Sequence, residues 1–206
     1  MIAIIDYGLG NIQAFKNIYK RLNIESKIVS NKNDLRNIKG IILPGVGSFD
    51  WAMKKLNDSG MRDILDQLVL EDKIPVIGIC VGMQIMALKS EEGTSNGLGW
   101  LNANVKKFDI NNKMINQLPH MGWNTINCIK KNALFKNLEI HSRFYFLHSY
   151  YFEESSNDQV LTKTDFGIRF TSCANRENIY AVQFHPEKSH DWGEKLLKNF
   201  SDIANA

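Results

Sequence analysis

The feature that most constrains the fold is an alternation of short apolar runs with segments of helical periodicity in the first half of the chain. Uninterrupted apolar runs at 2–5, 40–43 and 75–80 have the length of strands, and residues 12–22 and 49–57 repeat apolar side chains at helical spacing. Strands without polar alternation are typical of a sheet that is buried on both faces. The pattern predicts an α/β fold with a mainly parallel, doubly wound sheet flanked by helices.

The second half of the chain has a different pattern after about residue 100. Short runs there predict additional strands, partly antiparallel, followed by a closing helix at about 189–204. We expect a single domain over residues 1–206, because there is no internal repeat or low-complexity linker. Besides the elements above, the expected strands are 27–30, 105–108, 125–128, 144–147, 159–164, 168–174 and 179–184, and a further helix is expected at 61–70.

Composition restricts the class of protein. The chain is 44% hydrophobic and 23% charged, which suits one domain with a sizeable core. Its formal charge of +3 comes from scattered basic residues, so nucleic acid is not expected as a partner. Three cysteines without a CxxC pair favour a reducing compartment and no metal site. The apolar run at 2–5 is too short for a signal peptide or a membrane span, so we expect a cytoplasmic protein without a membrane partner.

The apolar run at 75–80 ends in a cysteine with a glycine two positions away on each side. Gly78 and Gly82 let the chain turn sharply, and the good helix formers of 84–89 follow, so Cys80 falls at a strand-to-helix reversal. Free N–H groups and the positive dipole end of a helix favour a thiolate and a developing oxyanion there. A lone cysteine is more often a small buried apolar residue, so this interpretation requires a base elsewhere.

A histidine and a glutamate follow the last predicted strand. His185 and Glu187 are two residues apart in an extended segment, so they point to the same side, and Pro186 restricts the backbone between them. A carboxylate on one ring nitrogen leaves the other to exchange a proton with a thiol. Alone, this pattern is more often a loop hydrogen bond or an ion pair. Together with Cys80, it predicts a catalytic triad.

A proline and glycine loop follows the apolar run at 40–43. Its glycines permit unusual backbone angles, so a peptide N–H of Val46 or Gly47 can turn toward the thiolate and complete an oxyanion hole with that of Val81. An ordinary turn or a phosphate loop is the alternative. The Walker lysine and the full GxGxxG spacing are both absent, which argues against a phosphate loop.

Three motifs carry a resemblance to a known family. Pro-Gly-Val-Gly-Ser-Phe from residue 44, Gly-Ile-Cys-Val-Gly-Met-Gln from residue 78 and Gln-Phe-His-Pro-Glu-Lys-Ser from residue 183 resemble the class I (triad-type) glutamine amidotransferases. Segments 6–11, 120–124 and 146–150 narrow the likeness to the glutaminase subunits of imidazole glycerol phosphate synthase, the HisH family. The similarity extends from residue 2 to about residue 200.

The resemblance implies a reaction and the residues that perform it. Cys80 would attack the side-chain amide of glutamine, Val81 and the 44–47 loop would hold the oxyanion, and His185 would protonate the departing ammonia. No cofactor is implied. The positions that match substrate contacts of the family are Gln84, Glu92, Ser149 and Tyr150.

The resemblance also implies a partner. A separate (β/α)₈ cyclase subunit would form a heterodimer with the chain, take up the ammonia through a channel, and raise the glutaminase activity. Matching positions near that junction are Asn11, Trp123, Tyr145 and Lys188, with core packing as the alternative for Trp123 and Tyr145. Two alternative functions stay open. The chain is a paralogous glutaminase that supplies ammonia to a different synthase, or it is a γ-glutamyl hydrolase or peptidase. We expect Cys128 and Cys173 in packing, and His120, His141 and His190 in structural or exposed positions.

Overall fold

The computed structural model describes residues 1–115, 117–138 and 142–206, so His141 lies outside the described residues. Within them, eleven strands form one mixed sheet and two strands form a second, small sheet. In these same ranges, no helix has the length and apolar character needed to cross a membrane.

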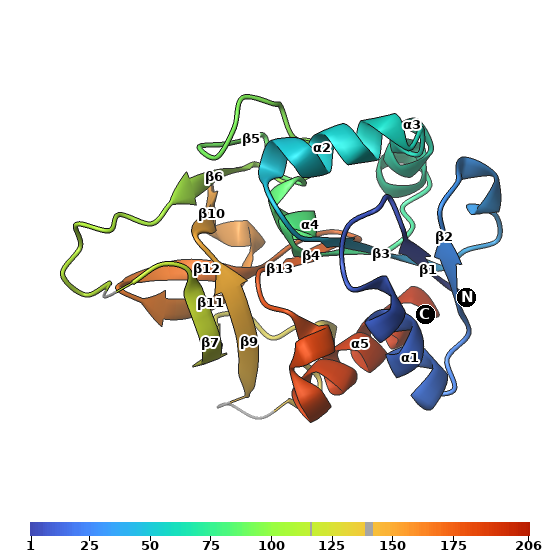
Figure 1. The fold of residues 1–206 in the computed structure, drawn as a ribbon. Helices are drawn as coiled ribbons and strands as arrows, with labels where there is room; N and C mark the ends of the chain where they lie inside the picture. Colours follow the sequence, from blue (N-terminus) through green and yellow to red (C-terminus); the bar gives the residue numbers. More distant parts are fainter. Residues whose placement is uncertain (116, 139–141) are drawn as a thin grey trace.

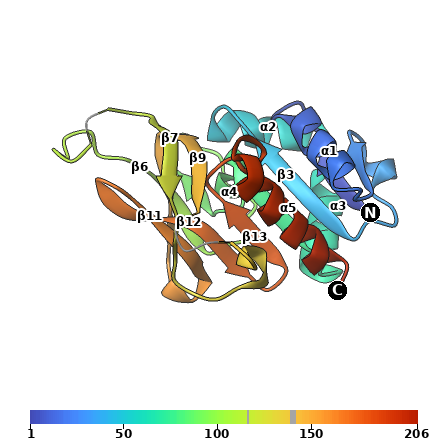
Figure 2. The ribbon, with the colours of Figure 1, turned by 90° about the horizontal axis from the view of Figure 1, so that it is seen from below.

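One half of the large sheet is parallel. Its strand order β2-β1-β3-β4-β13 is the order of flavodoxin-like doubly wound folds. Helices cover both faces, with α1 and α5 below the sheet and α2 and α3 above it in Figure 1, and Figure 2 shows α1 and α5 from below. The predicted fold class is therefore confirmed. The elements are β1 (Ile2–Ile5), α1 (Ile12–Arg21), β2 (Ser26–Val29), β3 (Gly40–Gly45), α2 (Phe49–Asp58), α3 (Arg62–Asp66) with a π-helical continuation (Gln67–Glu71), β4 (Val76–Cys80), β13 (Ile179–Val182) and α5 (His190–Ala204).

The other half of the sheet is mostly antiparallel. β12 (Ile168–Arg176) pairs with β13 and leads through β10 (Tyr150–Glu154) and β6 (Ala103–Lys107) to β5 (Lys89–Ser90). β11 (Val160–Phe166) pairs with β12 and with β8 (Asn127–Cys128), while β7 (His120–Thr125) and β9 (Arg143–His148) form the separate two-stranded sheet. Short helical turns lie at η1 (Lys32–Asp34), η3 (Ala133–Phe135), η4 (Asn157–Gln159) and η5 (Pro186–Lys188).

Three strands outside the parallel half differ from the prediction: β7, β10 and the two-residue β5. The expected strand at 125–128 is the end of β7 and the short β8, because β7 begins earlier, at His120. β10 was missed altogether, since its sequence ends in Glu153 and Glu154 and lacks a clear apolar alternation. Its pairing with β6 over five residue pairs supplies what its local sequence lacks.

The helix after Cys80 is much shorter than expected. α4 (Val81–Gln84) has four residues, whereas the helix formers at 84–89 predicted a continuation. The carbonyl groups of Ile85, Met86 and Ala87 instead accept hydrogen bonds from the backbone of residues 98–101. Tertiary pairing thus overrides helix propensity here, and the site retains the free N–H groups of one helical turn but not the dipole of a long helix.

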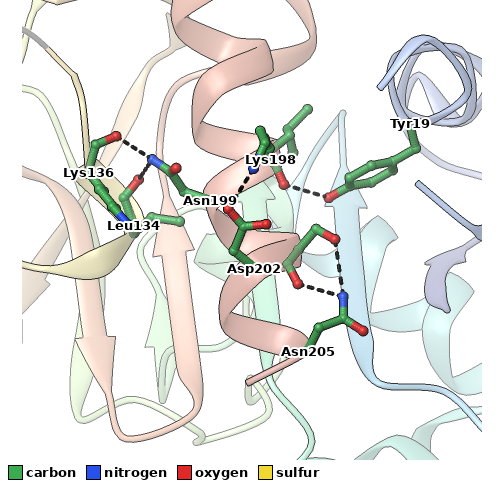
Figure 3. A network of polar contacts seen from close by, with 9 residues as sticks. Tyr19, Leu134, Lys136, Lys198, Asn199, Asp202 and Asn205 are labelled. Carbon is green, nitrogen blue, oxygen red and sulfur yellow. Dashed lines mark hydrogen bonds and ion pairs between the residues drawn. The ribbon is translucent and has the colours of Figure 1, made fainter. Parts of the chain in front are cut away.

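The C-terminal helix α5 is anchored on both sides, as Figure 3 shows. The Tyr19 hydroxyl of α1 donates to the carbonyl of Leu197, and the Asn199 amide donates to the carbonyls of Leu134 and Lys136. All three bonds join segments far apart in sequence. They fix the position of α5, and with it that of the segment between β13 and α5, which carries His185 and Glu187.

Candidate active site

Three adjacent parallel strands end at the same edge of the sheet and bring the predicted site together. Cys80, at the end of β4, lies opposite Gly45 of β3, and Ile79 lies opposite Val182, where β13 ends. The loop after β3 and the segment that carries His185 therefore both begin beside Cys80. Ligand sites of open α/β sheets form at this carboxyl edge.

Cys80 has the backbone of a sharp elbow. Its φ is 56° and its ψ is −113°, a conformation that costs a non-glycine residue about 1–3 kcal/mol. The turn brings backbone segments close together, and this is possible because Gly45 and Gly82 have no Cβ. A Cβ on Gly82 would overlap the carbonyl oxygen of Leu43, and one on Gly45 would lie 2.5 Å from the amide nitrogen of Gly82. The predicted strand-to-helix reversal is present, with the sulfur held at its tip.

His185 and Glu187 form a buried pair. His185 Nδ1 lies 2.8 Å from Glu187 Oε1, and the two side chains are 3% and 2% exposed. Burial alone would lower the pKa of His185, but hydrogen bonds to Cys80 and Glu187, together with their negative charges, raise it to about 10. The arrangement favours a protonated His185 ring between Cys80 and the Glu187 carboxylate. It links the three predicted triad residues in one line of contacts.

The thiol has further polar neighbours. Gln183 Nε2 donates to Cys80 Sγ at 3.8 Å, and the thiol lies 3.8 Å from the carbonyl oxygen of Leu147 as a donor. The backbone of His185 is pinned to β9, because its N–H donates to the carbonyl of Tyr145 at 2.8 Å. Strand β9 therefore sets the distance between the small sheet and the elbow.

A cavity of about 290 Å³ opens above the thiol. Its walls include the predicted thiol and base, all three predicted oxyanion residues and all four predicted substrate contacts, so these positions lie around one space. Glu187 lies behind His185 and is not part of the wall. The lining residues are Val46, Gly47, Cys80, Val81, Gln84, Glu92, Pro119, Leu147, His148, Ser149, Tyr150, His185 and Lys188.

Two carboxylates hold the loop of Glu92 against the start of α2. Glu92 Oε2 accepts the backbone N–H of Phe49 at 2.8 Å, and Asp50 accepts those of Thr94 and Ser95 at 3.0 Å each. Burial raises the pKa of Glu92, whereas the backbone hydrogen bonds lower that of Asp50. Because α2 directly follows the 44–47 loop, this reciprocal clasp ties the predicted oxyanion loop to a wall of the cavity.

The predicted partner positions are exposed or half-exposed rather than core. Trp123 is 37% exposed, its ring meets that of Tyr145 edge-on at 6.2 Å, and Lys188 Nζ lies 5.7 Å from the Tyr145 ring centroid. These three residues form one surface group beside the cavity. Asn11 is exposed at the start of α1, in a loop whose Gly10 lies against Pro44, so it belongs to a different part of the rim.

Sequence analysis missed several polar groups of the site. Gln183 and His148 are buried at 0% and 6% exposure, and the Tyr7 hydroxyl donates to the carbonyl of Pro44 at 2.7 Å. Gln183 stands two positions before His185 in the segment that the sequence predicts to be extended, which is a signal that could have found it. The expectation for Cys128 was wrong, because it is exposed, whereas Cys173 is fully buried. Among the described residues, no group of His, Cys, Asp or Glu is arranged to hold a metal ion.

Comparisons with known proteins point to the same family as the sequence motifs. A family model described as glutamine amidotransferase class-I matches residues 3–203. Imidazole glycerol phosphate synthase subunit HisH of Leptospira interrogans is 51% identical over 205 residues, which cover 98% of this chain and 100% of that protein. The protein of the same name from Bdellovibrio bacteriovorus is 52% identical over 204 residues, with the same coverage. A solved structure described as a glutamine amidotransferase matches with a TM-score of 0.77 at 22% identity over 100% of this chain and 99% of that one, a likeness of fold.

Proposed function

The chain belongs to the class I glutamine amidotransferases and, within them, to the HisH family, and we propose that it hydrolyses glutamine and delivers ammonia to a synthase partner. The observation that carries the proposal is the line of contacts from Glu187 through His185 to a thiol held at a strained elbow. The proposal assigns residues 1–206 to one amidotransferase domain. It needs no cofactor.

Cys80 is the proposed nucleophile. Its sulfur attacks the side-chain amide carbon of glutamine, and the C–N bond breaks as the nitrogen leaves as ammonia. His185, whose raised pKa keeps the ring protonated at neutral pH, supplies the proton that the leaving nitrogen needs. A γ-glutamyl thioester remains on Cys80. Water, deprotonated by His185, then attacks the thioester, and glutamate leaves as the thiol reforms.

The oxyanion of each tetrahedral step needs N–H donors that are already in place. The proposed donors are the N–H of Val81 and one from Val46 or Gly47, all of which line the cavity. Gly47 has a φ of 90°, in the left-handed region that glycine adopts readily. This freedom allows a peptide N–H of the 44–47 loop to point toward the thiol.

The proposed substrate contacts lie around the same cavity. Glu92 suits the α-ammonium group of glutamine, because its carboxylate is half-buried and reaches the wall. The backbone at Ser149 and Tyr150 suits the α-carboxylate, and Gln84 lies between them and the thiol.

The proposed acceptor is a (β/α)₈ cyclase that forms a heterodimer with this chain and makes imidazole glycerol phosphate and an aminoimidazole carboxamide ribonucleotide, a step of histidine biosynthesis. Full-length similarity to HisH subunits supports this assignment. The proposed contact surface includes Trp123, Tyr145 and Lys188 beside the cavity, and Asn11 on a different part of the rim. The proposed setting is the cytoplasm, where a free thiol stays reduced.

The direct test is glutamate release from glutamine by the purified chain, alone and with the cyclase subunit and its nucleotide ligand. We expect slow hydrolysis alone and strong stimulation by the cyclase. A cyclase that neither binds nor stimulates the chain would overturn the histidine-pathway assignment. Activity on γ-glutamyl peptides by the chain alone would instead favour the hydrolase.

A Cys80→Ala variant separates chemistry from assembly. Glutamine-dependent synthesis should fall by at least about 10³-fold, because the thioester cannot form. Synthesis from added ammonium should remain at the wild-type rate, since the cyclase is untouched. Loss of both activities, measured on the same complex, would show that Cys80 supports the fold or the interface rather than the chemistry.

A further inference from the structure

A continuous line of buried and partly buried hydrogen bonds connects strand β7 with the thiol. Asn124 Nδ2 lies 3.2 Å from His120 Nε2, and His120 Nδ1 lies 2.9 Å from His148 Nε2. His148 Nδ1 lies 2.7 Å from the carbonyl oxygen of Tyr150, which also accepts Gln84 Nε2 at 3.2 Å. Gln84 Nε2 donates to Gln183 Oε1 at 3.1 Å, and Gln183 donates to Cys80 Sγ.

The Tyr150 end determines the roles of both histidines. A carbonyl oxygen can only accept, so His148 must carry its proton on Nδ1. In a neutral ring the other nitrogen then accepts, and His148 Nε2 takes a hydrogen bond from His120 Nδ1. His120 is left with Nε2 as an acceptor.

The Asn124 end gives the same answer independently. Asn124 Oδ1 accepts the backbone N–H of Thr125 at 2.8 Å, and Nδ2 donates to the carbonyl of Asp165 at 3.0 Å. The amide orientation is therefore fixed, and the nitrogen faces His120 Nε2 as a donor. Taken together, the two ends require neutral rings with the proton on Nδ1.

The surroundings of the pair keep it neutral. His120 and His148 are 5% and 6% exposed and lie among the rings of Phe108, Phe146 and Phe170, and His120 also stacks on Phe166. Burial lowers the pKa of His120 to about 4 and that of His148 to about 3. The titratable groups that act on His148 are His120 and His185, and both disfavour its proton.

The far end of the line orients a substrate contact. Both N–H groups of Gln84 are engaged, one with Tyr150 and one with Gln183, so the oxygen is the group that Gln84 offers to a ligand in the cavity. The near end is a strand with two different faces. His120 and Asn124 point inward from β7, while Met121 and Trp123 are 60% and 37% exposed on its other face.

We propose that His120 and His148 are positioning residues that transmit the placement of strand β7 to the Tyr150 carbonyl and the Gln84 amide, and thereby set glutamine binding from the face that carries Trp123. This inference rests on the proposed function for the identity of the ligand. It assigns the pair no proton transfer in the reaction. Because β7 is also the proposed partner strand, contact with the cyclase would reach the substrate wall through these bonds.

The tautomers can be measured without any substitution. We expect ¹⁵N NMR of the histidine-labelled chain at about pH 7 to show both rings neutral with the proton on Nδ1, and to show them still neutral at about pH 5, where an unperturbed histidine is charged. A proton on Nε2 of either ring, or a charged ring at about pH 6, would overturn the proposal. This result does not depend on the glutaminase assignment.

Isosteric variants then test the positioning role in the cyclase complex. An asparagine amide can place its nitrogen near that of Nδ1, whereas a glutamine amide reaches toward Nε2, so His148→Asn retains the donor to Tyr150 and His148→Gln does not. We expect His148→Gln to raise KM for glutamine about tenfold or more, with a smaller change in kcat, and His148→Asn to restore most of that loss. His120→Asn, which retains the donor to His148, should likewise outperform His120→Leu.

A small thiol reagent provides the matched control. In a Cys128→Ser background, which removes the exposed thiol, the rate at which iodoacetamide labels Cys80 reports the elbow without requiring glutamine recognition. Equal KM values for His148→Asn and His148→Gln, or a labelling rate that falls in parallel with kcat/KM, would overturn the positioning role. If the wild-type complex hydrolyses no glutamine, the proposed function fails, and the NMR result still decides the state of the pair.

Discussion

The two walls of the cavity are built on opposite electrostatics. The wall from the parallel half contains a strained cysteine and a histidine held between this cysteine and Glu187, and these two neighbours raise the pKa of His185 to about 10. The wall from the small sheet and β10 contains a histidine among aromatic rings and a second neutral imidazole, which lowers the pKa of His148 to about 3. Both rings are almost fully buried. Burial alone therefore does not determine the charge of a histidine. At His185 the interactions with Cys80 and Glu187 outweigh burial, whereas at His148 the hydrogen bond to the Tyr150 carbonyl does not.

Substitutions in the charged wall, the one with Cys80 and His185, should reduce the glutaminase activity more than those in the neutral wall. Glu187→Gln preserves the shape of the side chain but removes the anion that stabilises the imidazolium, so glutaminase kcat should fall by about 10²–10⁴-fold. In titrations followed by NMR, the pKa of His185 should fall as well. Asp202→Asn, which breaks an exposed pair with Lys198, is the control and should leave both quantities unchanged. An unaltered kcat in Glu187→Gln would remove the charged character of this wall from the mechanism.

The two walls should also respond to pH with opposite signs. The unfolded pKa of histidine is about 6.5, so below it the unfolded chain binds a proton at residue 148 that the folded chain excludes. Stability should therefore fall by about 1.4 kcal/mol per pH unit from this residue as the pH drops from about 6.5 toward 3. The contribution of His185 is complete below about 6.5 and is lost as the pH rises toward 10.

Urea unfolding at a series of pH values tests these signs by difference. Against the wild type, His148→Asn should reduce the loss of stability at acid pH, and His185→Asn should reduce the loss at alkaline pH. The differences isolate the two residues from the carboxylates that titrate in the same acid range. Parallel pH profiles for all three proteins would contradict the contrast between the walls.

The smallest effect is expected at the clasp behind Glu92. Asp50→Asn weakens the hydrogen bonds to the N–H groups of Thr94 and Ser95, so the loop of Glu92 should lose part of its fixed position. KM for glutamine should rise about threefold to tenfold, while iodoacetamide labelling of Cys80 stays constant. Asp58→Asn, at the exposed end of α2, is the matched control. A change in labelling without a change in KM would assign the clasp to the elbow instead.

The sequence predicted the charged wall better than the neutral one, and the reason is physical. The elbow and the His-Pro-Glu segment are local: the glycines, the proline and the reacting groups stand within a few residues of each other. The cavity residues Gln84, Glu92, Ser149 and Tyr150 depended on resemblance, because nothing local distinguishes them from surface residues. The structure places them around the cavity, and their roles stay predictions.

The neutral wall depends on pairings between distant residues. His120 and His148 meet only because β7 and β9 pair in register over six residues, and β7 itself was not predicted at its observed start. The end of α4 at Gln84 has the same origin, since hydrogen bonds from residues 98–101 replace the next helical turn. For Trp123 the sequence left core packing open, because the sequence alone does not show whether an aromatic residue in a strand is buried or exposed.

The close backbone approach at the elbow has a consequence for how such a chain can change. Contacts between the peptide groups of Leu43, Gly45 and Gly82 fix the position of the thiol. These are backbone contacts, so side-chain substitutions elsewhere in the core do not remove them. A Cβ at Gly82 would overlap the carbonyl oxygen of Leu43, whereas the side chains of Met121 and Trp123 on the rim are 60% and 37% exposed. Backbone contacts thus fix the position of the thiol, whereas the surface proposed to bind a partner consists of exposed side chains.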